Sequence, residues 1–187
     1  MSAATAGHAR VGRLRINQVG LWLFFISESF LFAALLSSRY YLQGVNRPPQ
    51  LNQALGLAIT TVLLLSSLSA YRAEMSVAFG ERRRFLHNIL ATIALGGLFL
   101  VGVVVEWAEA FPHFPPQNGF GTLFFTLTGT HAAHVLSGVV LLLLVYLKGR
   151  RGRYTPANYW GVEGAVKYWH FVDLVWVFIY PTLYLVG

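Results

Sequence analysis

The sequence predicts an all-α, polytopic membrane protein, a bundle of five transmembrane helices, and two observations support this fold class. The chain has 187 residues, of which 56% are hydrophobic and 11% are charged, and its mean hydropathy is +0.56. A soluble globular domain carries roughly 25% charged residues, so this chain lacks the polar shell that would cover a soluble core. The apolar residues also gather in five stretches that are long enough to cross a bilayer.

Each apolar stretch is expected to be helical, because a backbone surrounded by lipid must satisfy its own hydrogen bonds. In chain order, the stretches are Val19–Leu42, Leu55–Tyr71, Phe85–Trp107, Phe120–Leu147 and Tyr168–Val186. Residues 1–17 are expected to form a flexible cytoplasmic N-terminus, and residues 18–187 a single five-helix membrane domain. The connections between the stretches leave no room for a soluble domain.

Lysine and arginine are divided unevenly between the two ends of these helices. Two of them, Arg39 and Arg47, lie at one end, whereas twelve lie at the end that holds the N-terminus: Arg10, Arg13, Arg15, Arg72, Arg82, Arg83, Arg84, Lys148, Arg150, Arg151, Arg153 and Lys167. Basic residues concentrate on the cytoplasmic side of a membrane, so we expect a cytoplasmic N-terminus and an external C-terminus. The formal net charge of +7 therefore indicates topology, and no nucleic-acid partner is expected.

The first and third stretches each carry a carboxylate. Glu28 lies near mid-membrane, where a charged carboxylate costs about 2.5–3.5 kcal/mol, so we expect it to be protonated or partnered. A proton-exchanging role and a structural hydrogen bond between helices are both open for Glu28. Glu106 lies near the external interface, where a solvated or capping role is expected.

Small residues in the second and third stretches allow neighbouring helices to approach closely. The third stretch offers Gly96, Gly97 and Gly102, and the second offers Ser66, Ser67, Ser69 and Ala70. These positions predict close helix packing.

The fourth stretch carries His131 and His134, which are three residues apart and share a helix face. A metal site would need further ligands, for which Glu28 and His170 are the candidates. Packing histidines held by hydrogen bonds are the favoured interpretation.

The fifth stretch opens with a polar and aromatic segment. His170 and Asp173 are expected near its cytoplasmic end, where they could pair with each other, reach the interface or face a neighbouring subunit. Tyr168 and Trp169 are typical of an interfacial aromatic belt. The chain has no cysteine, so no thiolate is available to a metal.

The chain resembles subunit III of the haem–copper respiratory oxidases in its short, five-helix form. The resemblance covers nearly the whole chain, from about Gly20 to Gly187, and two motifs carry it. TGTHAAHV at 128–135 is similar to the family's Thr-Gly-Phe-His-Gly-x-His-Val, and YWHFVD at 168–173 matches its Tyr-Trp-His-Phe-Val-Asp. Further matches are Ser27-Glu28, Ser66-Ser67, Leu95-Gly96 and Glu106. The chain departs from the family at Thr60-Thr61, where Asn-Thr is usual, and at Val103, where Gln is usual.

The resemblance implies a noncatalytic accessory subunit of a cytochrome c oxidase, which supports proton uptake, stability and lipid binding of the catalytic subunit. It implies direct contact with oxidase subunit I, subunit II in the same complex, and the inner membrane of a prokaryote as the location. Haem and copper are expected in the partner subunits, with bound phospholipid but no metal or catalytic residue on this chain.

The resemblance also assigns expected roles to individual residues. Glu28, Glu106 and Asp173 correspond to buried carboxylates that are proton-linked or structural. The remaining positions correspond to a polar framework: His131, His134, His170, Thr128, Ser66 and Ser67.

Several alternatives remain open at this stage. Subunit III of a quinol oxidase and a relative associated with nitric oxide reductase share the same resemblance. From other functional classes, a stand-alone proton or cation carrier would use Glu28, and a membrane metalloenzyme would use His131, His134 and a carboxylate.

Overall fold

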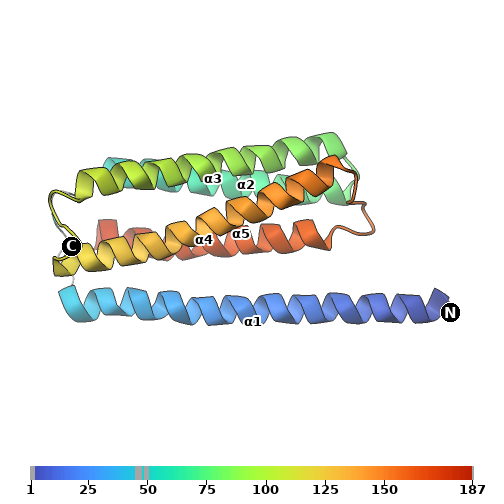
Figure 1. The fold of residues 1–187 in the computed structure, drawn as a ribbon, viewed down its shortest axis with the longest axis horizontal. Coiled ribbons are helices and arrows are strands. Elements are labelled where there is room, and N and C mark those ends of the chain that lie inside the picture. Colours follow the sequence, from blue (N-terminus) through green and yellow to red (C-terminus); the bar gives the residue numbers. More distant parts are fainter. Residues whose placement is uncertain (1–2, 45–47, 49–50, 187) are drawn as a thin grey trace.

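The computed structural model describes residues 3–44, 48 and 51–186, and the regular elements in them are all helices (Figure 1). They are α1 (Ala3–Gln43), α2 (Gln53–Ala78), α3 (Arg82–Ala110), α4 (Gly119–Arg150), α5 (Trp160–Tyr180) and a π-helical turn, η1 (Pro181–Leu185). The predicted all-α class is therefore confirmed.

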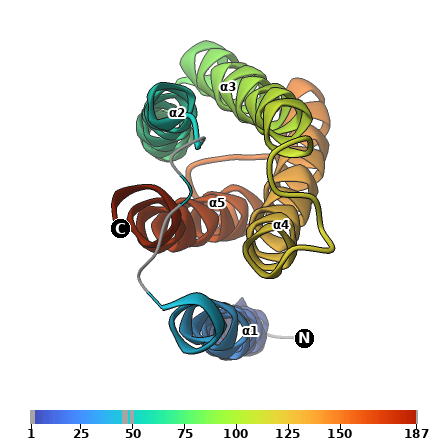
Figure 2. The same ribbon diagram turned by 90° about the vertical axis from the view of Figure 1, so that its left-hand side faces the viewer.

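Helices α2 to α5 run antiparallel to their chain neighbours and form a four-helix bundle, whereas α1 lies outside it (Figure 2). Within the bundle α2 packs on α3 and α5, and α4 packs on α3 and α5. Helix α1 packs on α4 and α5. The N- and C-terminal ends of the chain lie at opposite ends of the molecule (Figure 1).

Local sequence signals set several helix ends. Asn52 caps α2, because its side chain accepts a hydrogen bond from the backbone N–H of Leu55, and Asn118 caps α4 in the same way through Phe120. The turn between α2 and α3 is very short and contains Gly80 with a φ of 76°, a conformation that favours glycine. This turn fixes α2 and α3 as close antiparallel neighbours.

Four of the five predicted membrane spans coincide with helices that have the length and hydropathy of a transmembrane segment. The segments Leu14–Leu42, Gln53–Ala78, Arg82–Ala110 and Gly119–Arg150 are long and apolar enough to cross a membrane. Helix α5 begins at Trp160, eight residues before the predicted start at Tyr168, and its first half includes Glu163 and Lys167. That α5 also crosses the membrane stays a prediction.

Helix α1 also begins earlier than the sequence predicts. Residues 3–17, expected as a flexible segment before the membrane domain, continue the same helix. No proline interrupts this segment, and its alanine, arginine and leucine residues favour helix, so the helix that starts in the apolar stretch propagates beyond it. The cytoplasmic location of this segment stays a prediction.

The basic residues of the α2–α3 turn and of the α4–α5 connection lie at the end of the bundle where α1 begins (Figure 1). Arg82 links the two connections, because its guanidinium donates to the backbone carbonyls of Gly149 and Arg150 at the end of α4. A cation at a helix C-terminus is favourable for the helix dipole. Arg47, counted at the other end, lies outside the described residues, and which end is cytoplasmic stays a prediction.

The bundle core is built around two tryptophans of α5. Trp169 and Trp176 are both fully buried, and each donates its indole N–H to a hydroxyl of α2, Trp169 to Ser66 at 2.9 Å and Trp176 to Thr60 at 2.9 Å. The expectation of an interfacial belt at Tyr168 and Trp169 is wrong, because Tyr168 is 8% exposed and Trp169 lies in the core.

Candidate functional site

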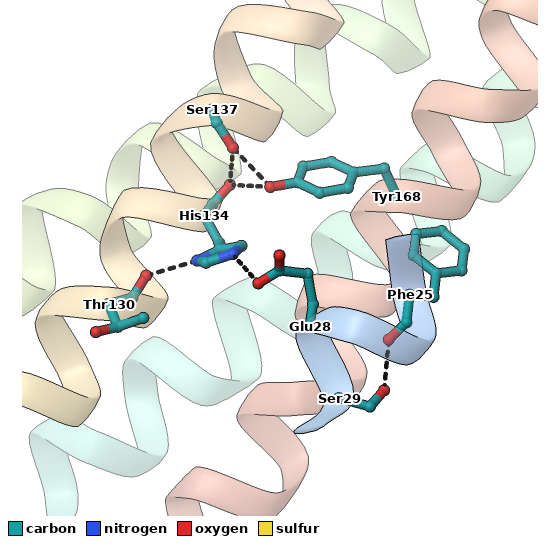
Figure 3. Close-up of polar contacts among 7 residues, drawn as sticks. All are labelled: Phe25, Glu28, Ser29, Thr130, His134, Ser137 and Tyr168. Carbon is teal, nitrogen blue, oxygen red and sulfur yellow. Dashed lines mark hydrogen bonds and ion pairs between the residues drawn. The ribbon is translucent and has the colours of Figure 1, made fainter. Parts of the chain in front are cut away.

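Glu28 of α1 and His134 of α4 form a direct side-chain contact, in which Glu28 Oε2 lies 3.1 Å from His134 Nε2 (Figure 3). Both side chains are 18% exposed. The sequence predicts that Glu28 is protonated or partnered within the bundle, and the structure supplies His134 as a partner.

The other ring nitrogen of His134 fixes the proton arrangement of this pair. Nδ1 lies 2.8 Å from the backbone carbonyl of Thr130, and a carbonyl only accepts, so Nδ1 carries a proton and donates it. The contact between Nε2 and Glu28 then needs one more proton, held by one of the two groups. The pair therefore holds a single shared proton and is neutral overall, which suits a site of low polarity.

Tyr168 and Ser137 extend this polar cluster along α4 and α5 (Figure 3). The Tyr168 hydroxyl lies 2.6 Å from Ser137 Oγ and 3.2 Å from the backbone carbonyl of His134. Both residues also line a groove of about 960 Å³ between α1 and the α4–α5 pair. The cluster that begins at Glu28 thus ends at the floor of an open groove.

The sides of this groove are mostly apolar. Phe24 and Ile16 of α1 face Leu141 of α4, while Trp160 and Gly164 line it from α5. The groove therefore has the shape and surface of a site for an apolar chain.

His131 does not share a site with His134, although the two residues are one helical turn apart. Its ring is fully buried among Phe32, Phe99 and Trp176, with the indole centroid 4.8 Å away. Neither ring nitrogen has a hydrogen-bond partner among the described residues. In the part of the chain that the structure describes, no group of three histidine, cysteine, aspartate or glutamate side chains comes together, so the predicted metal-site alternative gains no support.

The ring nitrogens of His131 and His134 lie in different surroundings. Those of His134 are engaged by Glu28 and Thr130, and those of His131 are enclosed by aromatic side chains. That haem and copper are held by partner subunits stays a prediction.

Glu106 is buried, so the expectation of a solvated or capping role is wrong. It is 2% exposed, because Tyr184 of η1 lies over it and donates its hydroxyl proton to Oε1 at 2.6 Å. Gln53 of α2 donates to the backbone carbonyl of Tyr184 at 2.9 Å. A side chain at Gly56 would collide with the tyrosine ring, since a Cβ there would lie 2.6 Å from it.

The Glu106–Tyr184 hydrogen bond is expected to stabilise the C-terminal turn. Tyr184→Phe would leave the buried carboxyl of Glu106 without its donor, at a cost of about 1–3 kcal/mol, and should lower the thermal midpoint of the purified protein complex. Tyr180→Phe is the matched control, because Tyr180 stacks on Tyr184 with centroids 5.1 Å apart and its hydroxyl makes no hydrogen bond to another described residue. Equal midpoints for the two variants would contradict a role for the bond.

His170 and Asp173 do not pair with each other. His170 Nδ1 lies 2.6 Å from Ser67 Oγ of α2, and Asp173 is 4% exposed between the two core tryptophans. Counted from Trp160, the two residues lie about 15 and 20 Å along the helix rather than at its start. Both residues therefore lie well inside α5, and their position relative to the membrane stays a prediction.

Most of the remaining polar framework is bound to indole groups. Ser66 accepts from Trp169, and Thr128 accepts from Trp107 at 3.0 Å. These hydroxyls lie buried between helices, which agrees with a structural role.

Sequence reasoning missed Tyr168, Tyr184 and Arg39. The sequence analysis interprets Tyr168 as an interfacial residue, does not single out Tyr184, and uses Arg39 as a topology marker only. Arg39 is 1% exposed, lies 5.2 Å from the Phe120 ring centroid and donates to the Gly44 carbonyl. Arg39 lies one turn before the helix end at Gln43. This spacing is the sequence signal that could have indicated a hydrogen bond from its guanidinium to a carbonyl at the helix C-terminus.

Comparisons with known proteins place the chain among membrane subunits. A family model described as cytochrome c oxidase subunit III matches residues 2–187. The protein named cytochrome c oxidase subunit 3 from Papio hamadryas is 33% identical over 190 residues, which cover 95% of this chain and 72% of that protein. The protein of that name from Equus caballus is 34% identical over 178 residues, covering 88% and 67%, and that from Corynebacterium diphtheriae is 33% identical over 199 residues, covering 98% and 95%.

Proposed function

Because this chain belongs to the cytochrome c oxidase subunit III family, we propose that it is the noncatalytic accessory subunit of a cytochrome c oxidase and supports proton uptake by the catalytic subunit. As a subunit III of a haem–copper oxidase, it is one component of a larger complex. In this proposal it contacts subunit I directly, shares the complex with subunit II, and leaves haem and copper to those partners.

The proposed electron donor is cytochrome c, because the relatives of this chain carry the name of a cytochrome c oxidase subunit. The alternatives are a quinol oxidase, in which the electron donor would be a quinol, and a complex related to nitric oxide reductase, in which the electron acceptor would differ. The proposed location is the inner membrane of a prokaryote, which is supported by a bacterial relative of nearly the same length.

The observation that carries the proton-uptake proposal is the contact between Glu28 and His134. A pair that holds one shared proton can release that proton and bind one again, and each event changes the charge of the pair by one. Both side chains are also partly exposed. Tyr168 and Ser137 connect the backbone of His134 to the floor of the groove. Because both side chains of the pair are 18% exposed, the pair is placed to exchange a proton directly with water or with a partner at the side of the bundle.

The groove is the proposed site for phospholipid. Its apolar sides suit an acyl chain, and its position between α1 and the α4–α5 pair would let a lipid fill the space beside a loosely packed helix. Asn17 and Trp160 line it and lie on the half of the bundle that also carries most of the basic residues, where an anionic headgroup would be favoured.

Purification through a tag on this chain tests the proposal. Haem-bearing polypeptides should co-purify, and their haem spectrum and substrate would distinguish a cytochrome c oxidase from a quinol oxidase. A solitary, colourless protein that moves protons or cations in vesicles would overturn the proposal in favour of a stand-alone carrier.

Glu28→Gln is expected to leave the haem content unchanged and to reduce the number of turnovers that the oxidase completes before it loses activity. The amide can still donate to His134 Nε2, but it cannot release a proton, so structure is kept while proton exchange is lost. Turnover is measured as oxygen consumption over time by the purified complex.

Glu109→Gln is the control for the loss of one carboxylate, because Glu109 is exposed at the C-terminal end of α3, on a different helix from Glu28. Equal turnover lifetimes for Glu28→Gln, Glu109→Gln and the unaltered complex would contradict a role of Glu28 in proton uptake.

A further inference from the structure

A second pocket, of about 250 Å³, lies between α2 and α3 beside the turn that joins them. Arg72 and Met75 line it from α2, and Arg84 and Asn88 line it from α3. Both helices are long and apolar enough to cross a membrane, and the turn between them holds only residues 79–81. A turn this short between two spans lies at the membrane surface, so the pocket opens at the level of lipid headgroups.

The α2–α3 pocket presents hydrogen-bond donors that have no partner on this chain. The side chains of Arg72 and Asn88 make no hydrogen bond to another residue in the described part of the chain. Arg84 uses Nη1 alone for both carboxylate oxygens of Glu81, at 2.8 and 2.9 Å, so its Nη2 and Nε remain for a ligand. A group with several acceptor oxygens would satisfy these donors.

The charge of the lining favours an anion. Arg72, Arg84 and Glu81 are the charged residues that line the pocket, which gives it a net charge of +1, and Glu81 is already paired with Arg84. Guanidinium groups bind phosphate oxygens well, because their planar fork matches the geometry of the phosphate. The pocket is therefore complementary to a phosphate with one net negative charge.

An exposed apolar surface continues from the pocket along α2. Met75, which lines the pocket, is 37% exposed, and Leu68 and Leu64 are each 47% exposed. Leu68 and Leu64 precede Arg72 at intervals of four residues, so they lie on the same face of the helix. A cationic pocket followed by an apolar face matches an amphiphile that has an anionic head and an acyl chain.

We propose that the α2–α3 pocket binds an anionic phospholipid. Arg72, Arg84 and Asn88 donate to its phosphate, and an acyl chain lies along Leu68 and Leu64. A zwitterionic lipid fits less well, because its headgroup adds a cation beside two arginines. The site is separate from the groove described above, which is formed by α1, α4 and α5.

A single thiol in the pocket tests this site in the whole tagged complex. The chain has no cysteine, so Met75→Cys provides the one thiol of this subunit, and its alkylation by a soluble maleimide is followed by mass spectrometry of this chain. In detergent, added phosphatidylglycerol should slow the alkylation. Leu147→Cys is the matched control, because Leu147 is 44% exposed near the end of α4, and its alkylation should change little.

Arg72→Gln in the Met75→Cys chain is expected to raise the concentration of phosphatidylglycerol needed for half protection about fivefold, the effect of one basic residue at a membrane surface. Arg72→Lys keeps the charge and should keep most of the protection. Arg151→Gln removes an exposed arginine at the end of α4 and should leave the protection unchanged.

Three results would overturn the proposal. Equal protection by phosphatidylcholine would show that the pocket does not select an anionic lipid, and equal protection by inorganic phosphate would show that it takes a free anion. A Met75→Cys thiol that stays unreactive with and without lipid would show that a partner protein covers the pocket. Each of these results leaves the assignment as an oxidase subunit untouched, because co-purification of haem-bearing polypeptides tests that separately.

Discussion

Gly96→Ala is expected to abolish most of the assembled complex, because the structure has no space for a methyl group at residue 96. A Cβ there would lie 2.5 Å from the Cη2 atom of Trp169. The indole cannot move away, since its other edge fills the gap beside Gly138, where a Cβ would lie 2.8 Å from it, and its N–H is bound to Ser66. Overpacking of this kind costs about 1–3 kcal/mol and would separate α3 from α5.

The neighbouring Gly97→Ala is the matched control, because nothing lies within 4 Å of a Cβ at that position. Alanine is favoured over glycine in a helix by about 1 kcal/mol, so this variant should be as stable as the natural chain or slightly more stable. The measurement is the yield of complex recovered through the tag, together with its thermal midpoint in detergent. Similar losses for both variants would show that helix flexibility, rather than packing on Trp169, matters in this region.

Trp176→Ala is expected to give the second large loss of stability, of about 3–5 kcal/mol, the usual range for removing a buried tryptophan. Trp176 is fully buried, contacts the ring of Phe99 from α3 and the ring of His131 from α4, and donates to Thr60 of α2. One side chain therefore joins all four helices of the bundle.

Trp22→Ala removes an indole of the same size from a surface position, since Trp22 is 62% exposed on α1. The thermal midpoint of the complex should fall strongly for Trp176→Ala and little for Trp22→Ala. A fall of equal size in both would refute the central role given to Trp176.

The helices could be predicted from the sequence because each long apolar stretch must satisfy its backbone internally. The last helix was placed less well. Glu163 and Lys167 make the first half of α5 look like a loop in a hydropathy window, whereas Lys167 forms an ion pair with Glu163 one turn away and covers Trp160. Such local neutralisation depends on helix geometry, which a composition window does not contain.

Glu28 and His134 of the candidate site were predicted as site residues, whereas Tyr168, Ser137 and the contacts among these residues were not. Spacing along one helix put His131 and His134 together, yet the contacts that matter join residues on different helices. Glu28 meets His134 across 106 positions of sequence, and Ser67 meets His170 across 103. Pairing over such distances follows from which helices pack together, and no local pattern encodes it.

Small residues were predicted correctly as places of close approach, although not all of them serve this purpose. Gly96 and Gly102 each lie against a side chain of another helix, Trp169 and Ile59 respectively, whereas Gly97 faces open space. Two adjacent glycines on a helix point about 100° apart, so only the packed arrangement decides which one is needed.

The position of α1 has a consequence for the order of events during biosynthesis. Helix α1 packs on α4 and α5, which are made after it, so Glu28 enters the membrane long before His134 exists. With 106 residues between them and synthesis at ~5–20 residues per second, the delay is roughly 5–20 s. Throughout that time the Glu28 carboxyl lacks the histidine partner that it has in the folded subunit.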